Sequence, residues 1–218
     1  MRKRCLPVLL LLLPAWGLWG QRCISQDRLS QYIHEHPGAQ AVRTELERFT
    51  GQWTGETPLA VQPRTAVTIP VVFHVVWRLP EENISDEQIQ SQLAALNQDF
   101  RLLNNTSGLI PAFFQPLAAD LELNFCLAKR TPEGLPTDGI VRVNTILPFI
   151  GDRIAGGRKS ITHPVGGGSG AWDPARYLNI WVGRRQFFPA EASFPGAAAE
   201  GEDGIIIDPR FVGTTGTA

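Results

Sequence analysis

The sequence predicts an α+β fold, with a mixed, twisted sheet of about five strands that is backed by one helix and preceded by two short helices. Two observations lead to this class. Several short segments rich in β-branched and aromatic residues have the length of strands, and stretches rich in glycine and proline separate them. Residues 86–103 instead repeat their apolar side chains at the spacing of one helix face. We expect that helix to cover the sheet.

The N-terminus predicts export. A basic stretch, Arg2 to Arg4, precedes an apolar run from Leu6 to Leu13 and then several small residues, which is the pattern of a secretory signal over residues 1–20. The run is shorter than the ~20 residues of a spanning helix, so no stable membrane span is expected after signal removal. A net charge of −1 gives no reason to expect nucleic-acid binding. The protein is therefore expected to be secreted or extracytoplasmic.

Residues 21–66 are predicted to form a pro-segment and linker. Apolar side chains recur at helical spacing on both sides of Pro37-Gly38, which predicts two short amphipathic helices between Ser25 and Thr50. From Gly51 to Arg64 the chain is rich in glycine, threonine and proline and shows no periodicity, which predicts an exposed linker. A protease could release the pro-segment at such a linker.

The ordered domain is predicted to begin with a central strand. The run from Ile69 to Trp77 consists almost entirely of β-formers, as in a strand buried on both faces. A helix follows: Ser85 is a suitable N-cap, Gln88 stands at the capping-box position, and Ile84 and Ile89 have the spacing of a hydrophobic staple. This strand and helix should form the first packed unit of the domain.

The helix is expected to continue to Leu103 and to bury one face made by Ile89, Leu93, Leu96, Phe100 and Leu103. Further strands are predicted at Leu121–Ala128, Gly139–Val143, Tyr177–Val182 and Asp203–Asp208. Between them, Gly151 to Gly170 is rich in glycine and predicts a long flexible loop. Together these segments supply the sheet and its connections.

Several of these segments, taken in order, resemble the pappalysin-like (cytophagalysin) family of metzincin metallopeptidases. The segments that carry the resemblance are Val71–Val76, Leu96–Phe100, Phe125–Ala128, Tyr177–Val182 and Asp203–Ala218. In that family a stretch similar to the last one leads directly into the helix with the zinc motif H-E-x-x-H-x-x-G-x-x-H. The resemblance implies that residues 67–218 are the N-terminal, or upper, subdomain of a catalytic domain, truncated before its zinc helix.

The resemblance also implies a function. The chain would be part of a secreted zinc metalloendopeptidase precursor, with zinc in the full-length enzyme and a protein or peptide as substrate; whether calcium is also required stays open. By analogy with metzincins, an antiparallel edge strand would bind extended peptide through Glu191, Ala192, Ser193 and Phe194. The alternative is a secreted, non-catalytic binding or structural module with a peptidase-like sheet.

The residues present do not include the chemistry of hydrolysis. The sequence contains no H-E-x-x-H motif, so no catalytic residue and no metal ligand is assigned within it, and we expect this chain alone to be inactive and to bind no zinc.

Two cysteines remain after the signal. Cys23 is similar in placement to the cysteine of pappalysin-like precursors that could hold the enzyme latent by binding zinc through its thiolate, but a structural or disulfide role is an equal alternative. Cys126 could pair with Cys23 or with a cysteine outside these residues. Both alternatives stay open at the level of sequence.

Overall fold

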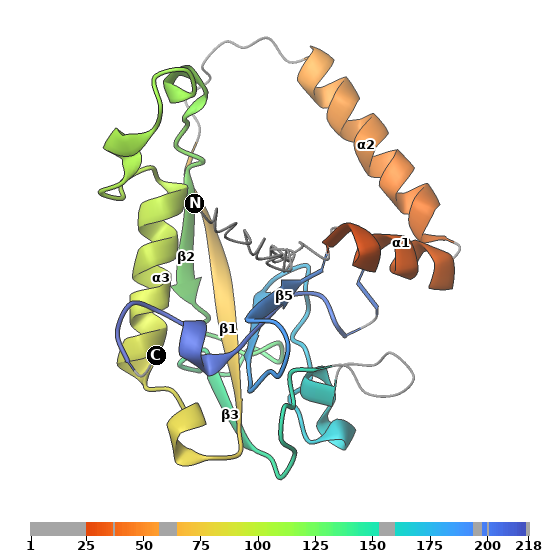
Figure 1. Ribbon diagram of the computed structural model, residues 1–218, viewed down its shortest axis with the longest axis vertical. Coiled ribbons are helices and arrows are strands. Elements are labelled where there is room, and N and C mark those ends of the chain that lie inside the picture. Colours follow the sequence, from red (N-terminus) through yellow and green to blue (C-terminus); the bar gives the residue numbers. More distant parts are fainter. Residues whose placement is uncertain are drawn as a thin grey trace, which may run out of the picture.

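A six-stranded mixed sheet organises the protein (Figure 1). The computed structural model describes residues 25–36, 38–56, 65–152, 160–193, 198–199 and 201–216. The helices are α1 (Ser25–Glu35), α2 (Ala39–Glu56) and α3 (Asp86–Phe100). The strands are β1 (Val67–Trp77), β2 (Leu123–Leu127), β3 (Ile140–Asn144), β4 (Leu178–Val182), β5 (Ala190–Ala192) and β6 (Ile205–Ile207). The predicted fold class is confirmed, with six strands in place of about five.

The long central strand β1 uses both of its edges. One edge pairs with β4 and continues through β6 to β5, and all of these pairings are parallel except the last. The other edge is shared, because β2 pairs with residues 67–71 of β1 and β3 pairs with residues 73–77. The chain leaves the sheet between β2 and β3 and returns at Gly139, whose carbonyl accepts a hydrogen bond from Phe73 N at 2.9 Å. The strand predicted at 139–143 is therefore a continuation of the same edge.

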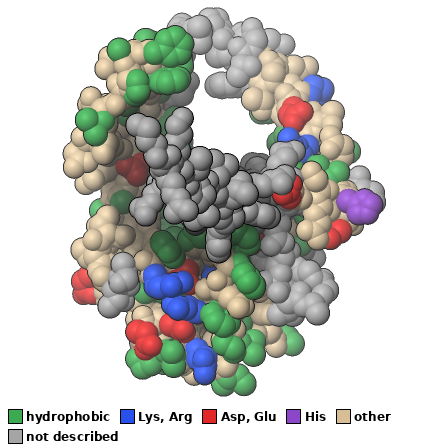
Figure 2. All heavy atoms as spheres, viewed as in Figure 1, with side chains coloured by type: hydrophobic (Ala, Val, Ile, Leu, Met, Phe, Trp, Pro, Cys, Tyr) green, Lys and Arg blue, Asp and Glu red, His purple; other side chains and the backbone are tan. Residues whose placement is uncertain are grey.

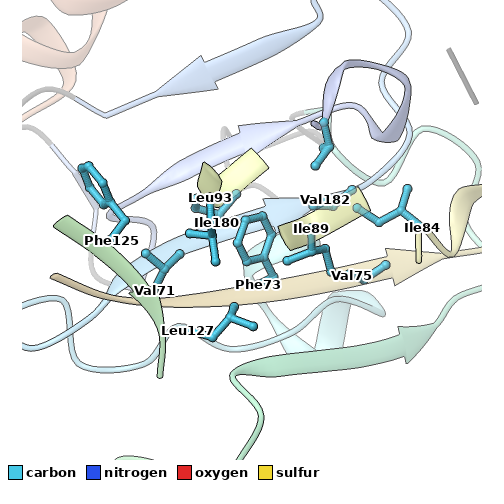
Figure 3. Packing of buried hydrophobic residues seen from close by; sticks show 11 residues of the cluster. Val71, Phe73, Val75, Ile84, Ile89, Leu93, Phe125, Leu127, Ile180 and Val182 are labelled. Carbon is cyan, nitrogen blue, oxygen red and sulfur yellow. The ribbon is translucent and has the colours of Figure 1, made fainter. Parts of the chain in front are cut away.

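Helix α3 covers one face of the sheet. Ser85 caps it as predicted, since its Oγ accepts a hydrogen bond from Gln88 N at 3.2 Å. The staple residues Ile84 and Ile89 are both buried in the main apolar cluster, which also contains Phe73 from the centre of β1. Figure 3 shows side chains of this cluster, contributed by β1, β2, β4 and α3, close together.

Helix α3 ends three residues earlier than the apolar spacing predicts. Leu102 adopts a φ of 53°, the left-handed conformation that usually falls to glycine at this point. Leu102 N then bonds to Asp99 O at 3.1 Å and Leu103 N to Gln98 O at 2.7 Å, the two hydrogen bonds of a Schellman motif. Leu103 is consequently 72% exposed instead of part of the buried face. The sequence has no glycine here to mark the stop.

Loops cover the opposite face of the sheet. Trp181 of β4 and Ile206 of β6 are almost fully buried there, together with Ile150, which precedes the glycine-rich connection, and Ile161 within it. That connection was predicted as a flexible loop, but residues 160–162 and 164–166 form 3-10 turns in it. The two faces of the sheet are thus covered by different kinds of structure.

The two predicted N-terminal helices are present as α1, which ends at Glu35, and α2, which begins at Ala39. Helix α2 continues to Glu56, so Gly51–Glu56, predicted as linker, is helical instead. The apolar face of α2 is exposed at Val42, Leu46 and Phe49. No helix of the described residues is long and apolar enough to cross a membrane. The predicted signal, residues 1–20, lies outside the described residues.

Candidate functional site

Strand β5 forms one edge of the sheet. It pairs only with β6 among the described strands, antiparallel, with Glu191 opposite Ile206. The sequence analysis predicted an antiparallel edge strand in this region, and the structure places one there. A free edge of this kind carries unpaired backbone N–H and C=O groups and can accept a further strand.

The register identifies the backbone groups that face outward. Asp208 N donates to Pro189 O at 2.8 Å, and Ser193 N donates to Gly204 O at 3.2 Å. Residue pairs along an antiparallel ladder alternate between hydrogen-bonded and non-hydrogen-bonded, so Glu191 directs its own backbone groups inward to β6. The N–H and C=O groups of Ala190 and Ala192 therefore point away from β6, toward the free edge.

The four residues predicted to bind substrate have different environments. Ala192 presents backbone groups to the free edge, whereas the Glu191 backbone faces β6 and its side chain is largely buried. Ser193 follows the strand, and its hydroxyl donates to Glu202 O at 3.1 Å. Phe194 lies outside the described residues. Ala190, which the sequence analysis did not select, shares the orientation of Ala192, and only the pairing register could have identified it.

Asp208 fixes the end of β6 beside this edge. Its carboxylate is fully buried and accepts hydrogen bonds from Arg185 N at 2.9 Å, from Arg210 N at 3.0 Å and from Arg210 Nε at 2.8 Å. Burial alone would raise the pKa of Asp208, but the Arg210 guanidinium and the two backbone N–H groups together hold that pKa below its ordinary value. Asp208 is therefore a charged structural anchor for three segments at the rim.

A buried polar network lies behind the rim, on the face covered by loops. His74 of β1 contacts Ser169 Oγ through Nδ1 at 2.7 Å and Asn179 Oδ1 through Nε2 at 3.1 Å. Because the Asn179 oxygen can only accept, Nε2 carries the proton and Nδ1 accepts from the Ser169 hydroxyl. Burial lowers the pKa of His74 to about 4, which keeps the ring neutral.

A histidine that contacts a serine on one side and an asparagine on the other could suggest a nucleophilic triad. All three side chains are at most 6% exposed, and Trp181 stacks on the imidazole at 5.1 Å between ring centroids. No substrate can reach such a hydroxyl. The network instead attaches the glycine-rich connection to the sheet, as expected for a satisfied core histidine.

The segment after β6 is attached to α3. Gln88 Nε2 donates to Pro209 O at 3.1 Å and to Val212 O at 2.9 Å, so its side chain is turned to this segment, away from the capping-box position. Gly213 N donates to Gln92 Oε1 at 2.7 Å. Gly213 has a φ of 75°, and a Cβ there would lie 2.3 Å from Ser91 Oγ. The close approach to α3 therefore requires glycine at this position.

No group of three or more His, Cys, Asp or Glu side chains able to hold a metal ion occurs among the described residues. His34 and His36 lie exposed on or just after α1, away from the buried His74. Cys126 is exposed and not in a disulfide. The predicted latency residue, Cys23, lies outside the described residues.

The fold is similar to that of mirolysin and promirolysin, which are metallopeptidases of the metzincin, pappalysin-like type. Mature mirolysin of Tannerella forsythia, in complex with a cleaved peptide, is 36% identical and matches 72% of this chain with a TM-score of 0.65. Promirolysin of the same organism, in a mutant form, is 31% identical and matches 87% of this chain with a TM-score of 0.69. This chain spans 57% of the mature mirolysin chain and 60% of the promirolysin chain. No protein-family model and no curated protein matches the sequence.

Proposed function

We propose that this chain belongs to a zinc metalloendopeptidase precursor and contributes the part of its catalytic domain that binds the substrate backbone. The observation that carries the proposal is the 36% identity, over 72% of this chain, with a mirolysin that was solved with a cleaved peptide. The fold supports it, because the antiparallel strand at the rim of an otherwise parallel sheet pairs on one side only among the described strands.

The substrate would bind as an additional strand beside β5. Ala190 and Ala192 would exchange backbone hydrogen bonds with an extended peptide, which fixes the position and direction of the chain to be cut. Their methyl side chains are small and leave room for the side chains of the substrate. Backbone recognition of this kind does not select a sequence, so specificity would depend on other surfaces of the whole protein.

Zinc is proposed for the whole protein only. The described residues offer no fitting ligand set, so the ligands would come from residues outside those described. When bound, zinc in such enzymes activates a water molecule for attack on a peptide carbonyl. The described residues would bind the peptide through β5 and fix the surroundings of that strand through Asp208 and α3.

The N-terminal part would be processed before activity. We assign residues 1–20 to a secretory signal, residues 21–66 to a pro-segment and linker, and residues 67–218 to the catalytic subdomain of a secreted enzyme. Promirolysin matches 87% of this chain but mature mirolysin only 72%, which supports the assignment of a pro-segment.

A contact of α1 supports the same assignment. The Tyr32 hydroxyl donates to Ala198 O at 3.2 Å, so α1 lies near the segment that follows β5 (Figure 1). A pro-segment in that place would restrict access to the edge. Cys23 is the proposed zinc-blocking residue, and the sequence equally allows it a structural role.

The test is expression of the complete reading frame that contains these residues. We expect the matured product to contain one zinc ion per molecule and to hydrolyse denatured casein, and we expect a zinc chelator to abolish hydrolysis and added zinc to restore it. The purified 218-residue chain is the matched control. A complete product that binds no zinc and cleaves nothing would contradict the proposal and favour the non-catalytic module.

A further inference from the structure

A buried arginine lies beneath the edge strand. Arg185 follows β4 by three residues, and its side chain is only 2% exposed. Its Nη2 donates to Glu191 Oε2 at 3.1 Å, and its Nε lies 3.7 Å from Asp152 Oδ1, an ion-pair contact too long for a hydrogen bond. The Glu191 side chain is 14% exposed. The centre of β5 is thus tied to the interior by a buried ion pair.

The Arg185 guanidinium is buried with two of its nitrogen atoms unpaired by hydrogen bonds among the described residues, which is energetically unfavourable. Arg185 Nε and Nη1 have no hydrogen-bond partner among the described residues, although both atoms are buried. Buried donors without partners are uncommon, because each one forfeits its hydrogen bonds to water. A hydrophobic side chain of similar volume would often be tolerated as well or better. The charge at this position therefore calls for a reason other than stability.

Strand β5 is short. It contains only Ala190, Glu191 and Ala192, it pairs with β6 alone among the described strands, and neither alanine nor glutamate favours strands. Glu191 is the one side chain of β5 that reaches inward to a charged partner. The backbone of Glu191 pairs with β6, and its side chain contacts Arg185. Because both contacts are made by the central residue of β5, they fix the orientation of the whole strand.

Both the backbone and the side chain of Arg185 are held in place. Its backbone N–H donates to the buried carboxylate of Asp208 at 2.9 Å. Its side chain passes over Gly151, where a Cβ would lie 2.7 Å from Arg185 Cγ. The path of the side chain from the end of β4 to the centre of β5 is therefore determined by the packing around it.

We propose that Arg185 is a positioning residue for peptide binding: through Glu191 it holds β5 so that the backbone groups of Ala190 and Ala192 keep the geometry of a ladder strand at the free edge. This inference rests on the proposed function, because it names what aligns the peptide-binding edge. Arg185 would not touch the substrate. Misalignment of the edge would weaken binding of every extended peptide, whatever its sequence.

The positioning can be tested without any activity, by amide hydrogen exchange in the 218-residue chain. In Arg185→Met, which keeps much of the buried volume, we expect the Glu191 amide to exchange about tenfold faster or more, because Glu191 loses its inward contact with the Arg185 guanidinium. Arg185→Lys, which keeps the charge, should recover part of the protection. Arg184→Met is the matched control and should exchange like the parent. Unchanged exchange in Arg185→Met would overturn the proposal, whether or not the complete protein is a peptidase.

The second readout is the kinetics of the complete, matured protein with a quenched-fluorescence peptide. We expect Arg185→Met to raise KM by about tenfold with little change in kcat, since the edge binds ground state and transition state alike. Arg184→Met should leave both constants unchanged. Faster exchange at Glu191 with parental KM and kcat would reduce Arg185 to a purely structural residue and overturn the positioning role. A parent protein without activity would contradict the proposed function instead. The exchange result would still test whether Arg185 holds β5 in place.

Discussion

The centre and the edge of the sheet are held by different kinds of contact. Strand β1 has eleven residues, pairs with three strands, and its middle portion is fully buried. Strand β5 has three residues, pairs only with β6 among the described strands, and contacts a buried arginine through Glu191. Apolar burial fixes the position of the central strand, whereas polar contacts fix the edge, where a peptide would bind. The contrast separates the apolar burial that stabilises the fold from the polar contacts that would position a peptide.

The largest effect is expected at the centre. Phe73 is fully buried in the cluster between α3 and the sheet. Phe73→Ala should lower the free energy of unfolding by ~3–5 kcal/mol, because it removes a large apolar side chain and leaves a cavity. Urea denaturation measures this loss. A loss under ~1 kcal/mol would show that the centre is not held by apolar burial.

Acid should lower the stability of the protein through His74, a polar residue of β1. The pKa of His74 is lowered from 6.5 to about 4 in the folded protein, so the unfolded chain takes up the proton first as the pH falls. The contribution of His74 to stability is therefore full above pH 6.5 and is lost between there and about pH 4, by about 3 kcal/mol in total.

Urea denaturation at several pH values measures this effect. His74→Gln should flatten the dependence in that window, and the exposed His34→Gln should keep that of the parent. Equal slopes for the parent and His74→Gln would show that the imidazole is not kept neutral by burial.

A smaller effect is expected at the end of α3. Phe100 is only partly buried against the cluster, and its ring contacts Phe125 edge-on at 5.0 Å between centroids. Phe100→Ala should lower the free energy of unfolding by about 2 kcal/mol, less than Phe73→Ala, because less apolar surface returns to water. Leu103→Ala, at an exposed position, is the matched control and should change it little. Equal losses for Phe73→Ala and Phe100→Ala would remove the distinction between centre and periphery.

The centre could be predicted from local sequence patterns, whereas the edge strand followed only from the family resemblance and its register could not be predicted. The run of β-formers in β1 and the cap, staple and spacing of α3 are local patterns with direct physical causes, and the structure confirms them except for the end of the spacing, at Leu103. The early end of α3 escaped prediction because Leu102 takes the conformation usually given to glycine.

The edge escaped for a different reason. Its position in the chain followed from the family resemblance, but the choice between Ala190 and Glu191 as outward-facing residues depends on the register with β6, which no local pattern encodes. Arg185 was missed because its partners lie on other segments, at positions 152 and 191.

The smallest effect on stability is expected at Ala192, where a proline removes only an outward-facing N–H. Because that N–H does not pair with β6, Ala192→Pro should lower the free energy of unfolding by less than ~1 kcal/mol. Ala192→Ser keeps the N–H and is the matched control for folding and for side-chain size.

The most direct measurement of the central claim is kcat/KM of Ala192→Pro in the complete, matured protein. We expect kcat/KM to fall at least about tenfold for every extended peptide tested, because one backbone hydrogen bond to the substrate is lost and the ring obstructs the edge. Ala192→Ser should retain the parental value. A folded Ala192→Pro enzyme with the kcat/KM of the parent would contradict the account, since peptide would then bind somewhere other than the free edge of β5.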